Sequence, residues 1–332
     1  MARILIASAA YGGENVGDDA ILAAIVEQLR SIDSQIQITA VTRRAREMGE
    51  RFGIETLELM GLTNRLKTYA AIARHDLLII GGGALIAEYT RGWKGVVAGH
   101  PGYPMTMLAV AKLLGKGTMV YAVGVESIRS PQQRFFVRLI FDRADLITLR
   151  DEDSRIRLTQ DLGIRRTRVV TTADPVLGLV LPPEPETEER PDASSASDPS
   201  NASDSDSEAR PLVVINFAYG VDRRDALLDF MARTADYVIH QLGAKVLFVP
   251  MNVLEHTDRR GMHLVLERMQ ESRYASIMQP PFDYRDVLDI VRHATLVISS
   301  RMHLLILAAI VLVPILGISR VPKIDAFLAH YG

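Results

Sequence analysis

Two side chains that could work together in catalysis stand near the end of the sequence. Arg301 and His303 follow the apolar run Leu296–Ile298, which predicts a buried strand, and Lys323 lies twenty residues further on. Residues two apart at a strand end point to the same side, so a guanidinium and an imidazole are predicted to share one space. The guanidinium can clamp an anion with two hydrogen bonds, and the imidazole can carry a proton near neutral pH. The pattern favours a small substrate with two negative charges that is protonated during the reaction. The alternative, that Arg301 pairs with a local carboxylate and His303 caps the next helix, stays open at this point.

A glycine-rich loop follows the first apolar run. Residues 11–18 read Tyr-Gly-Gly-Glu-Asn-Val-Gly-Asp and open a helical pattern. The glycines permit close approach of a ligand to backbone N–H groups, and a helix start favours negative charge. The spacing is not that of a dinucleotide-binding fingerprint. The alternative is that Asp18 or Asp19 is a plain helix N-cap.

Gly81–Gly83 and Arg150 each follow a predicted strand, and an aromatic loop lies between them. Gly81-Gly82-Gly83 ends one of them, and three glycines in a row either present bare backbone to a ligand or form a simple turn. The loop over residues 88–103 holds the single tryptophan and two tyrosines, which either line a sugar site or only hold the loop together. Arg150 ends another strand and could form a surface pair with Asp151.

Taken together, these blocks carry a resemblance to a known family. Arg301-Met302-His303 with the apolar run behind it and Pro322-Lys323 resembles the C-terminal signature of the polysaccharide pyruvyl transferases. Four more blocks resemble that family in the same order, and the blocks together span residues 11 to 323: Asn15-Val16-Gly17-Asp18-Asp19-Ala20, Gly81-Gly82-Gly83, Arg150-Asp151-Glu152-Asp153-Ser154 and Ala173-Asp174-Pro175-Val176.

The resemblance implies transfer of pyruvate from phosphoenolpyruvate to a sugar of a cell-wall or exopolysaccharide precursor, as a cyclic ketal, with release of phosphate. Arg150, Arg301 and Lys323 are then expected to bind the donor's charges, with His303 as the proton carrier. The substrate-binding residues expected beside them, with Asn15 and Asp18 on the acceptor side, are Asn15, Gly17, Asp18, Gly82, Gly83 and Met302. Phosphoenolpyruvate is a co-substrate, and neither a cofactor nor a metal is expected. Residues 256–258 and 283–286 are interpreted as helix starts rather than metal ligands.

Composition predicts two domains joined by a linker. A length of 332 residues suits two domains of ordinary size, 1–180 and 211–332. Between them, residues 184–210 hold nine acidic residues and seven serines but no Val, Ile, Leu, Met or aromatic residue. Such a segment cannot bury enough apolar surface to offset its ordering entropy, so a disordered linker is expected. The absence of cysteine excludes disulfides and thiolate chemistry.

Both flanking halves alternate short apolar runs with helical patterns, which predicts parallel sheets covered on both faces. The expected fold class is α/β: two Rossmann-like domains in a glycosyltransferase-B-like arrangement, with the active site in the cleft between them. The strands are predicted at residues 3–9, 36–41, 77–80, 118–123, 146–149, 213–217, 246–250, 276–278, 296–299 and 314–318.

The apolar run Leu304–Ile318 is too short to span a bilayer and contains Pro314, so it predicts a buried helix followed by a buried strand. We expect a soluble, cytoplasmic protein with no nucleic-acid partner and peripheral membrane contact only through a lipid-linked acceptor. Two other functions fit the same architecture: a glycosyltransferase that uses a sugar nucleotide, and a non-catalytic polysaccharide-binding protein. The presence of all four candidate cationic groups favours the pyruvyl transferase.

Overall fold

The computed structural model describes residues 1–8, 11–13, 15–88, 102–181, 210–219, 225–319 and 321–331, the side chains of Glu255 and His256 excepted. Apart from Arg210, the predicted linker over residues 184–210 lies outside the described residues. Most of the predicted aromatic loop over residues 88–103 lies outside them too.

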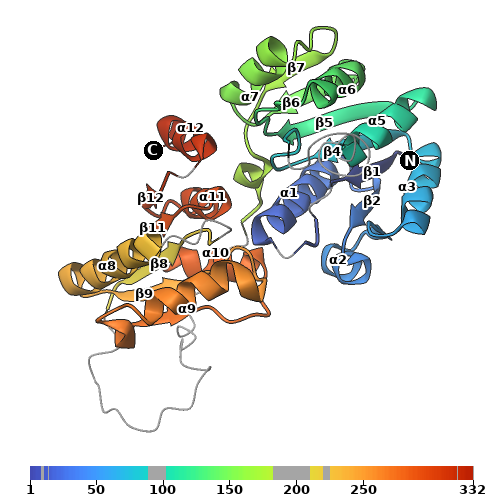
Figure 1. The fold of residues 1–332 in the computed structure, drawn as a ribbon. Coiled ribbons are helices and arrows are strands. Elements are labelled where there is room, and N and C mark those ends of the chain that lie inside the picture. Colours follow the sequence, from blue (N-terminus) through green and yellow to red (C-terminus); the bar gives the residue numbers. More distant parts are fainter. Residues whose placement is uncertain are drawn as a thin grey trace.

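The N-terminal half forms a parallel sheet of seven strands in the order β3-β2-β1-β4-β5-β6-β7 (Figure 1). The central strands β1 and β4 are almost entirely apolar and buried, because both of their faces are covered by helices. The strands are β1 (Arg3–Ala7), β2 (Gln37–Thr42), β3 (Glu55–Glu58), β4 (Leu77–Gly81), β5 (Gly117–Val123), β6 (Leu146–Leu149) and β7 (Arg168–Thr171).

The C-terminal half forms a second parallel sheet of five strands in the order β10-β9-β8-β11-β12. Its strands are β8 (Leu212–Asn216), β9 (Lys245–Phe248), β10 (Ala275–Ile277), β11 (Leu296–Ser299) and β12 (Ile315–Gly317). In both sheets the strand order reverses beside the first strand of the half, β1 or β8. Such a reversal leaves a crevice at the carboxyl ends of the strands.

All ten predicted strands are present, and the predicted α/β class is confirmed. Two edge strands were missed: β3 reads Glu-Thr-Leu-Glu and β7 reads Arg-Val-Val-Thr. Each lies at the margin of the sheet and is only partly buried, so neither needs the apolar run by which a central strand is recognised.

The helices of the N-terminal half cover the two faces of its sheet. Helices α3 (Leu62–Arg74), α5 (Gly102–Leu113) and α6 (Pro131–Phe141) pack on one face. Helices α1 (Val16–Ile32) and α2 (Ala45–Phe52) pack on the other. The short helix α7 (Glu152–Ile156) follows β6.

In the C-terminal half, α8 (Asp225–Leu242) and α9 (Arg260–Leu266) pack on one face of the sheet. Helices α10 (Tyr284–Arg292) and α11 (Met302–Ile310) pack on the other and face the first domain, while α12 (Pro322–Tyr331) ends the described chain (Figure 1).

One hydrophobic core continues across the domain boundary. It includes Ile21 and Ile25 of α1 together with Leu288 of α10 and Leu305 of α11. The backbone joins the halves as well, since the N–H of Val16 donates to the carbonyl of Met251 at 3.0 Å. The first turn of α1 is therefore held directly against the C-terminal domain.

The apolar run over residues 304–318 folds as a buried helix, α11, and a strand, β12, as predicted. β12 is an edge strand and is only partly buried, so the expectation of a buried strand was wrong. Among the described residues, no helix has both the length and the apolar character to cross a membrane.

Candidate active site

Arg150 is held at the carboxyl end of β6, facing the second domain. Its guanidinium lies over Gly124, where an added Cβ would come within 2.7 Å of Nη2, so only glycine fits beneath it. Nη1 donates to Oδ2 of Asp174 at 3.4 Å, and Nε lies 3.5 Å from Asp151. The pair with Asp151 that the alternative expected is therefore present, but it is not a surface pair, because the Arg150 side chain is only 5% exposed. Asp151 also caps α7 by accepting the N–H of Ser154 at 2.7 Å.

His303 lies in the first turn of α11 with its ring against Gly17 of α1. A Cβ at Gly17 would lie 2.1 Å from Nδ1 of the imidazole, so the glycine is required for the two helices to meet here. Nε2 is 3.8 Å from Oδ2 of Asp174 and has no hydrogen-bond partner in the described part of the chain. Burial lowers the pKa of His303 to about 4; Asp174 opposes this shift, while Arg150, Lys323 and Arg301 add to it. The expectation that His303 titrates near neutrality is therefore wrong for this state of the protein.

Asp174 connects these two groups from the short helix Pro175–Gly178. It is 6% exposed, accepts the N–H of Val176 at 3.2 Å, and contacts Arg150 and His303 through the same oxygen. Asp174 was not among the site residues predicted from the sequence, although the segment Ala173–Val176 that contains it resembles one of the family's sequence blocks. It links a cation of the first domain to the imidazole of the second.

Arg301 precedes α11 and pairs with a buried carboxylate. Its Nη2 lies 2.7 Å from Oδ1 of Asp258, and Nε donates to Oδ2 at 3.2 Å. Arg301 therefore pairs with a carboxylate, as the alternative expected, but the partner lies 43 residues away along the chain rather than locally, and His303 lies inside the helix rather than capping it. Asp258 was interpreted as part of a helix start, which is correct, because the helical turn Glu255–Arg259 runs directly into α9; the sequence did not indicate that Asp258 is fully buried.

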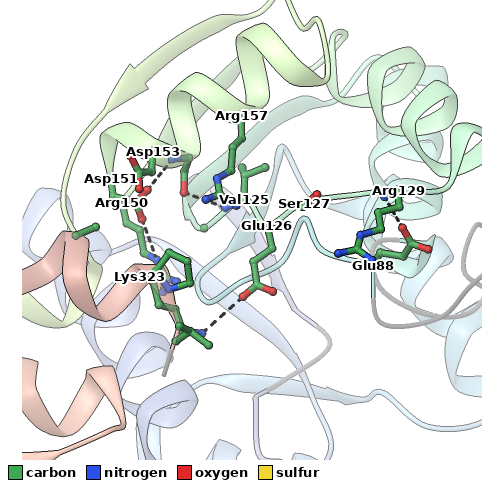
Figure 2. A pocket seen from close by; sticks show the side chains of 15 residues that line it. Glu88, Val125, Glu126, Ser127, Arg129, Arg150, Asp151, Asp153, Arg157 and Lys323 are labelled. Atoms are coloured by element: carbon green, nitrogen blue, oxygen red, sulfur yellow. Dashed lines mark hydrogen bonds and ion pairs between the residues drawn. The ribbon is translucent and has the colours of Figure 1, made fainter. Parts of the chain in front are cut away.

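Lys323 begins α12 and reaches toward the first domain (Figure 2). Its Nζ is 3.7 Å from Oε1 of Glu126, which follows β5. Burial lowers the pKa of Lys323, with a further lowering from Arg150 and an opposing contribution from Glu126. Arg150, Lys323 and Glu126 line a pocket of about 370 Å³ between the domains. Glu126 was also missed, although its place after a parallel strand could have drawn attention to it.

Asp18 lies in the first turn of α1 and belongs to the same charged group. Burial raises its pKa to about 7, and its neighbour Asp19 raises it further against the opposing effect of Lys323, Arg150 and Arg301. Asp19 is engaged elsewhere, because it accepts the N–H of Gly12 at 2.8 Å. Neither aspartate is the N-cap of α1; that residue is Asn15, whose side chain accepts the N–H of Gly17 at 3.1 Å. The N-cap thus lies three residues before Asp18, the earlier of the two aspartates considered for it.

The remaining predicted site residues, Gly82, Gly83 and Met302, are explained mainly by backbone conformation and packing. Gly82 and Gly83 both have a φ of +73°, which strongly favours glycine, and a Cβ at Gly82 would come within 2.2 Å of Ile21. A Cβ at Gly83 would lie 3.7 Å from Oδ1 of Asp18, so this glycine lies beside the charged group. The side chain of Met302 is buried in the core that both domains share and does not line the pocket.

The arrangement therefore brings three cations, one imidazole and the carboxyl groups of Asp18, Asp174 and Asp258 to the domain boundary. Arg301, His303 and Asp18 do not themselves line the pocket, but Arg301 acts to lower the pKa values of both Asp18 and His303. Such a group can bind a compact anion with several charges and can exchange protons with it. Within the described residues, no three His, Asp or Glu side chains are grouped as metal ligands would be.

Two parallel α/β domains with a charged pocket between them define a glycosyltransferase-B-like architecture. Solved structures with the same fold include three sugar enzymes, which are 10–11% identical to this chain and so show the fold alone. UDP-GlcNAc 2-epimerase from Neisseria meningitidis bound to UDP-GlcNAc has a TM-score of 0.59, over 98% of this chain and 85% of that one. The UDP-GlcNAc 2-epimerase from Methanocaldococcus jannaschii has a TM-score of 0.58, over 97% of this chain and 85% of that one. A glycosyltransferase from Rickettsia africae has a TM-score of 0.56, over 95% of this chain and 79% of that one.

The sequence identifies the family, which the fold alone does not. No curated protein matches the chain. The sequence model of the polysaccharide pyruvyl transferases matches residues 15–320, nearly the whole chain. The protein belongs to the polysaccharide pyruvyl transferase family.

Proposed function

We propose that this protein transfers pyruvate from phosphoenolpyruvate to a sugar of a polysaccharide precursor, forming a cyclic ketal and releasing phosphate. The observation that carries the proposal is the convergence of Arg150 and Lys323 on one interdomain pocket, with Arg301 and His303 beside them. Phosphoenolpyruvate carries a carboxylate and a phosphate on a three-carbon frame. Its charges match a compact set of cations better than they match a nucleotide pocket.

Binding of phosphoenolpyruvate would convert His303 to the protonated form that the reaction needs. With protein groups alone around it, the imidazole is neutral at pH 7, because its pKa is about 4. A bound dianion places opposite charge nearby, which favours the protonated form and raises the pKa. The imidazolium then gives its proton to C3 of the enol, and C2 becomes electrophilic. Asp174, 3.8 Å from Nε2, stabilises the charged ring before the transfer.

Asp18 is suited to the acceptor side of the same step. A carboxyl group with a pKa of about 7 is half ionised at neutral pH, so it can accept the proton of the attacking hydroxyl. The first hydroxyl forms a C–O bond at C2 while C3 gains the proton from His303. A second hydroxyl then displaces phosphate from C2, and its proton leaves with the phosphate as HPO₄²⁻, while Asp18 returns the proton of the first hydroxyl to solvent. Atoms and charges balance without a cofactor.

A thermal-shift comparison tests the proposal directly. Phosphoenolpyruvate should raise the melting temperature at concentrations where a panel of UDP-, GDP- and ADP-sugars does not, because ligand that binds only the folded state stabilises it. Phosphate release that depends on a saccharide acceptor would then show transfer. A shift with a nucleotide sugar alone would indicate a glycosyltransferase. No shift with either donor class, together with binding of polysaccharide, would indicate a non-catalytic protein.

A further inference from the structure

The carboxylate of Asp258 is fully buried and pairs with Arg301. We propose that Asp258 is a positioning residue for the donor: it holds the Arg301 guanidinium in the orientation that binds phosphoenolpyruvate. The inference rests on the proposed function for the identity of the donor, while the contact itself stands on the geometry.

The first argument is the form of the contact. Both carboxylate oxygens of Asp258 engage Arg301, Oδ1 at 2.7 Å from Nη2 and Oδ2 at 3.2 Å from Nε. A two-point contact fixes the plane of a guanidinium as well as its position. It uses one edge of the group and leaves Nη1 outside the pair. The Arg301 side chain is 31% exposed, so the pair with Asp258 leaves part of it accessible.

The second argument is that Asp258 is anchored independently of Arg301. The backbone N–H of Asn252 donates to Oδ2 at 3.2 Å and that of Tyr219 to Oδ1 at 3.4 Å. The side-chain amide of Asn216 lies 3.5 Å from Oδ2. These groups follow or end β8 and β9, the central strands of the C-terminal sheet. The carboxylate is therefore fixed by the sheet, and the longer and more flexible arginine side chain adjusts to it.

The third argument concerns the domain boundary. Asn252 also pairs with Asn15 at the start of α1, in an isolated antiparallel bridge. Asp258 thus joins the donor arginine to the loop that contacts the acceptor-side domain. A fully buried carboxylate is costly unless it is paired and hydrogen-bonded, so a simple stabilising role is the competing explanation.

A double-mutant cycle separates the two explanations. Asp258→Asn keeps the size and an acceptor oxygen but removes the charge, and it should weaken phosphoenolpyruvate binding about tenfold by calorimetry. In the Arg301→Ala background the same change should have no further effect on the affinity, because the group to be positioned is gone. Asp258→Glu keeps the charge but displaces it by one methylene, and it should lose affinity while unfolding near the wild-type temperature.

Asp236→Asn is the matched control. Asp236 lies in the same domain and accepts backbone N–H groups of Gln270 and Glu271, so its loss should lower stability without changing donor affinity. Unchanged phosphoenolpyruvate affinity in folded Asp258→Asn, or an equal loss in both arginine backgrounds, would overturn the inference.

A second measurement needs no donor. In ¹⁵N NMR of the free protein, the Nε–H of Arg301, assigned by its absence in Arg301→Lys, should exchange slowly with water in the wild type and rapidly in Asp258→Asn. Rapid exchange in the wild type would show that the pair does not persist and would also overturn the inference. A wild-type protein that shows the slow signal but does not bind phosphoenolpyruvate would instead contradict the proposed function.

Discussion

Each of the three cations assigned to the donor has a carboxylate partner in the protein. Arg150 pairs with Asp174, Arg301 with Asp258 and Lys323 with Glu126. The first two partners are almost fully buried, whereas Glu126 is 45% exposed. The two arginines are therefore preorganised, while Lys323 can leave its partner for a ligand at little cost.

The first prediction assigns Arg150, Arg301 and Lys323 to donor binding and His303 to proton transfer. Replacing Arg150, Arg301 or Lys323 by Ala should weaken phosphoenolpyruvate binding about ten- to a hundredfold, since each charge-assisted contact contributes about 1.5–3 kcal/mol. Arg301→Lys should restore only part of the affinity, because an ammonium cannot reproduce the planar fork. Binding is measured by calorimetry and turnover by phosphate release.

His303→Asn should behave differently, with much of the binding kept and turnover reduced about a hundredfold or more, as expected for a missing proton carrier. If turnover survives and binding collapses, the histidine is a donor ligand and the acid must be another group.

A second residue-scale prediction follows from the pKa of about 7 at Asp18. Between about pH 4 and pH 7 the folded protein retains a proton on Asp18 that the unfolded chain has released, so this residue makes the free energy of unfolding fall as the pH rises. Asp18→Asn lacks the effect. Its stability relative to wild type should increase from about pH 4 to pH 7 and stay constant above that range.

Urea unfolding across this pH range measures the difference. Asp142→Asn is the control: burial acts to raise the pKa of Asp142, but N–H groups of residues 165–167 outweigh it and lower the pKa, so its effect belongs below the range tested. A difference between Asp18→Asn and wild type that does not change with pH would contradict the raised pKa.

At the scale of elements, the site depends on two helix starts that meet across the boundary. Helix α1 presents Gly17 and α11 presents His303, with no room for a side chain between them. Asn15 caps α1, and Ser299 holds the turn before α11 by accepting the N–H of Arg301 at 2.9 Å. The local chemistry of two turns therefore sets the position of the imidazole.

The third prediction tests this contact. Gly17→Ala places a methyl group 2.1 Å from Nδ1 of His303, so the helices must separate or the ring must move. We expect a loss of about 1–3 kcal/mol in the free energy of unfolding, as for overpacked cores, together with reduced turnover. In a His303→Gly background, which also removes the His303 Cβ that would lie 2.6 Å from the new methyl, Gly17→Ala should cost much less. An equal loss in both backgrounds would show that the glycine is needed for another reason.

At the scale of the whole molecule, the two sheets are not independent units. The core formed by α1, α10 and α11 belongs to both halves, and the pocket takes its cations from both. Separation of the halves would expose this apolar surface to water and would also disperse the charged groups.

The fourth prediction is that the intact protein unfolds in a single calorimetric transition, because the shared core couples the halves. Scanning calorimetry at neutral pH measures it, and agreement between the calorimetric and van't Hoff enthalpies is the criterion. Substituting Leu305 by Ala within the shared core should lower this transition as a whole. Two resolved transitions, only one of which responds to Leu305→Ala, would contradict the coupling.

Much of the fold could be predicted from the sequence because burial on both faces leaves a plain signal. The apolar runs of β1, β4, β8 and β11 are long enough to be recognised, and helices recur between them. β3 and β7 could not be predicted, since an edge strand is defined by its partner rather than by its own composition. The start of α1 was misplaced because Asn15 caps it through its side chain, while two acidic residues just beyond offered an equally good signal.

The site shows the same division. Arg150, Arg301, His303, Lys323 and the family to which they point were determined by the sequence alone, because residue types and their order along the chain are enough to recognise them. The tertiary structure decided which carboxylates face them. Asp174, Asp258 and Glu126 lie between 24 and 197 residues from their partners along the chain. It also decided that His303 is neutral and that Asp18 is the group with a pKa near 7, because desolvation depends on what covers a side chain. Which side chains are covered is decided when helices and strands pack together, and the spacing of residues along the chain does not contain that information.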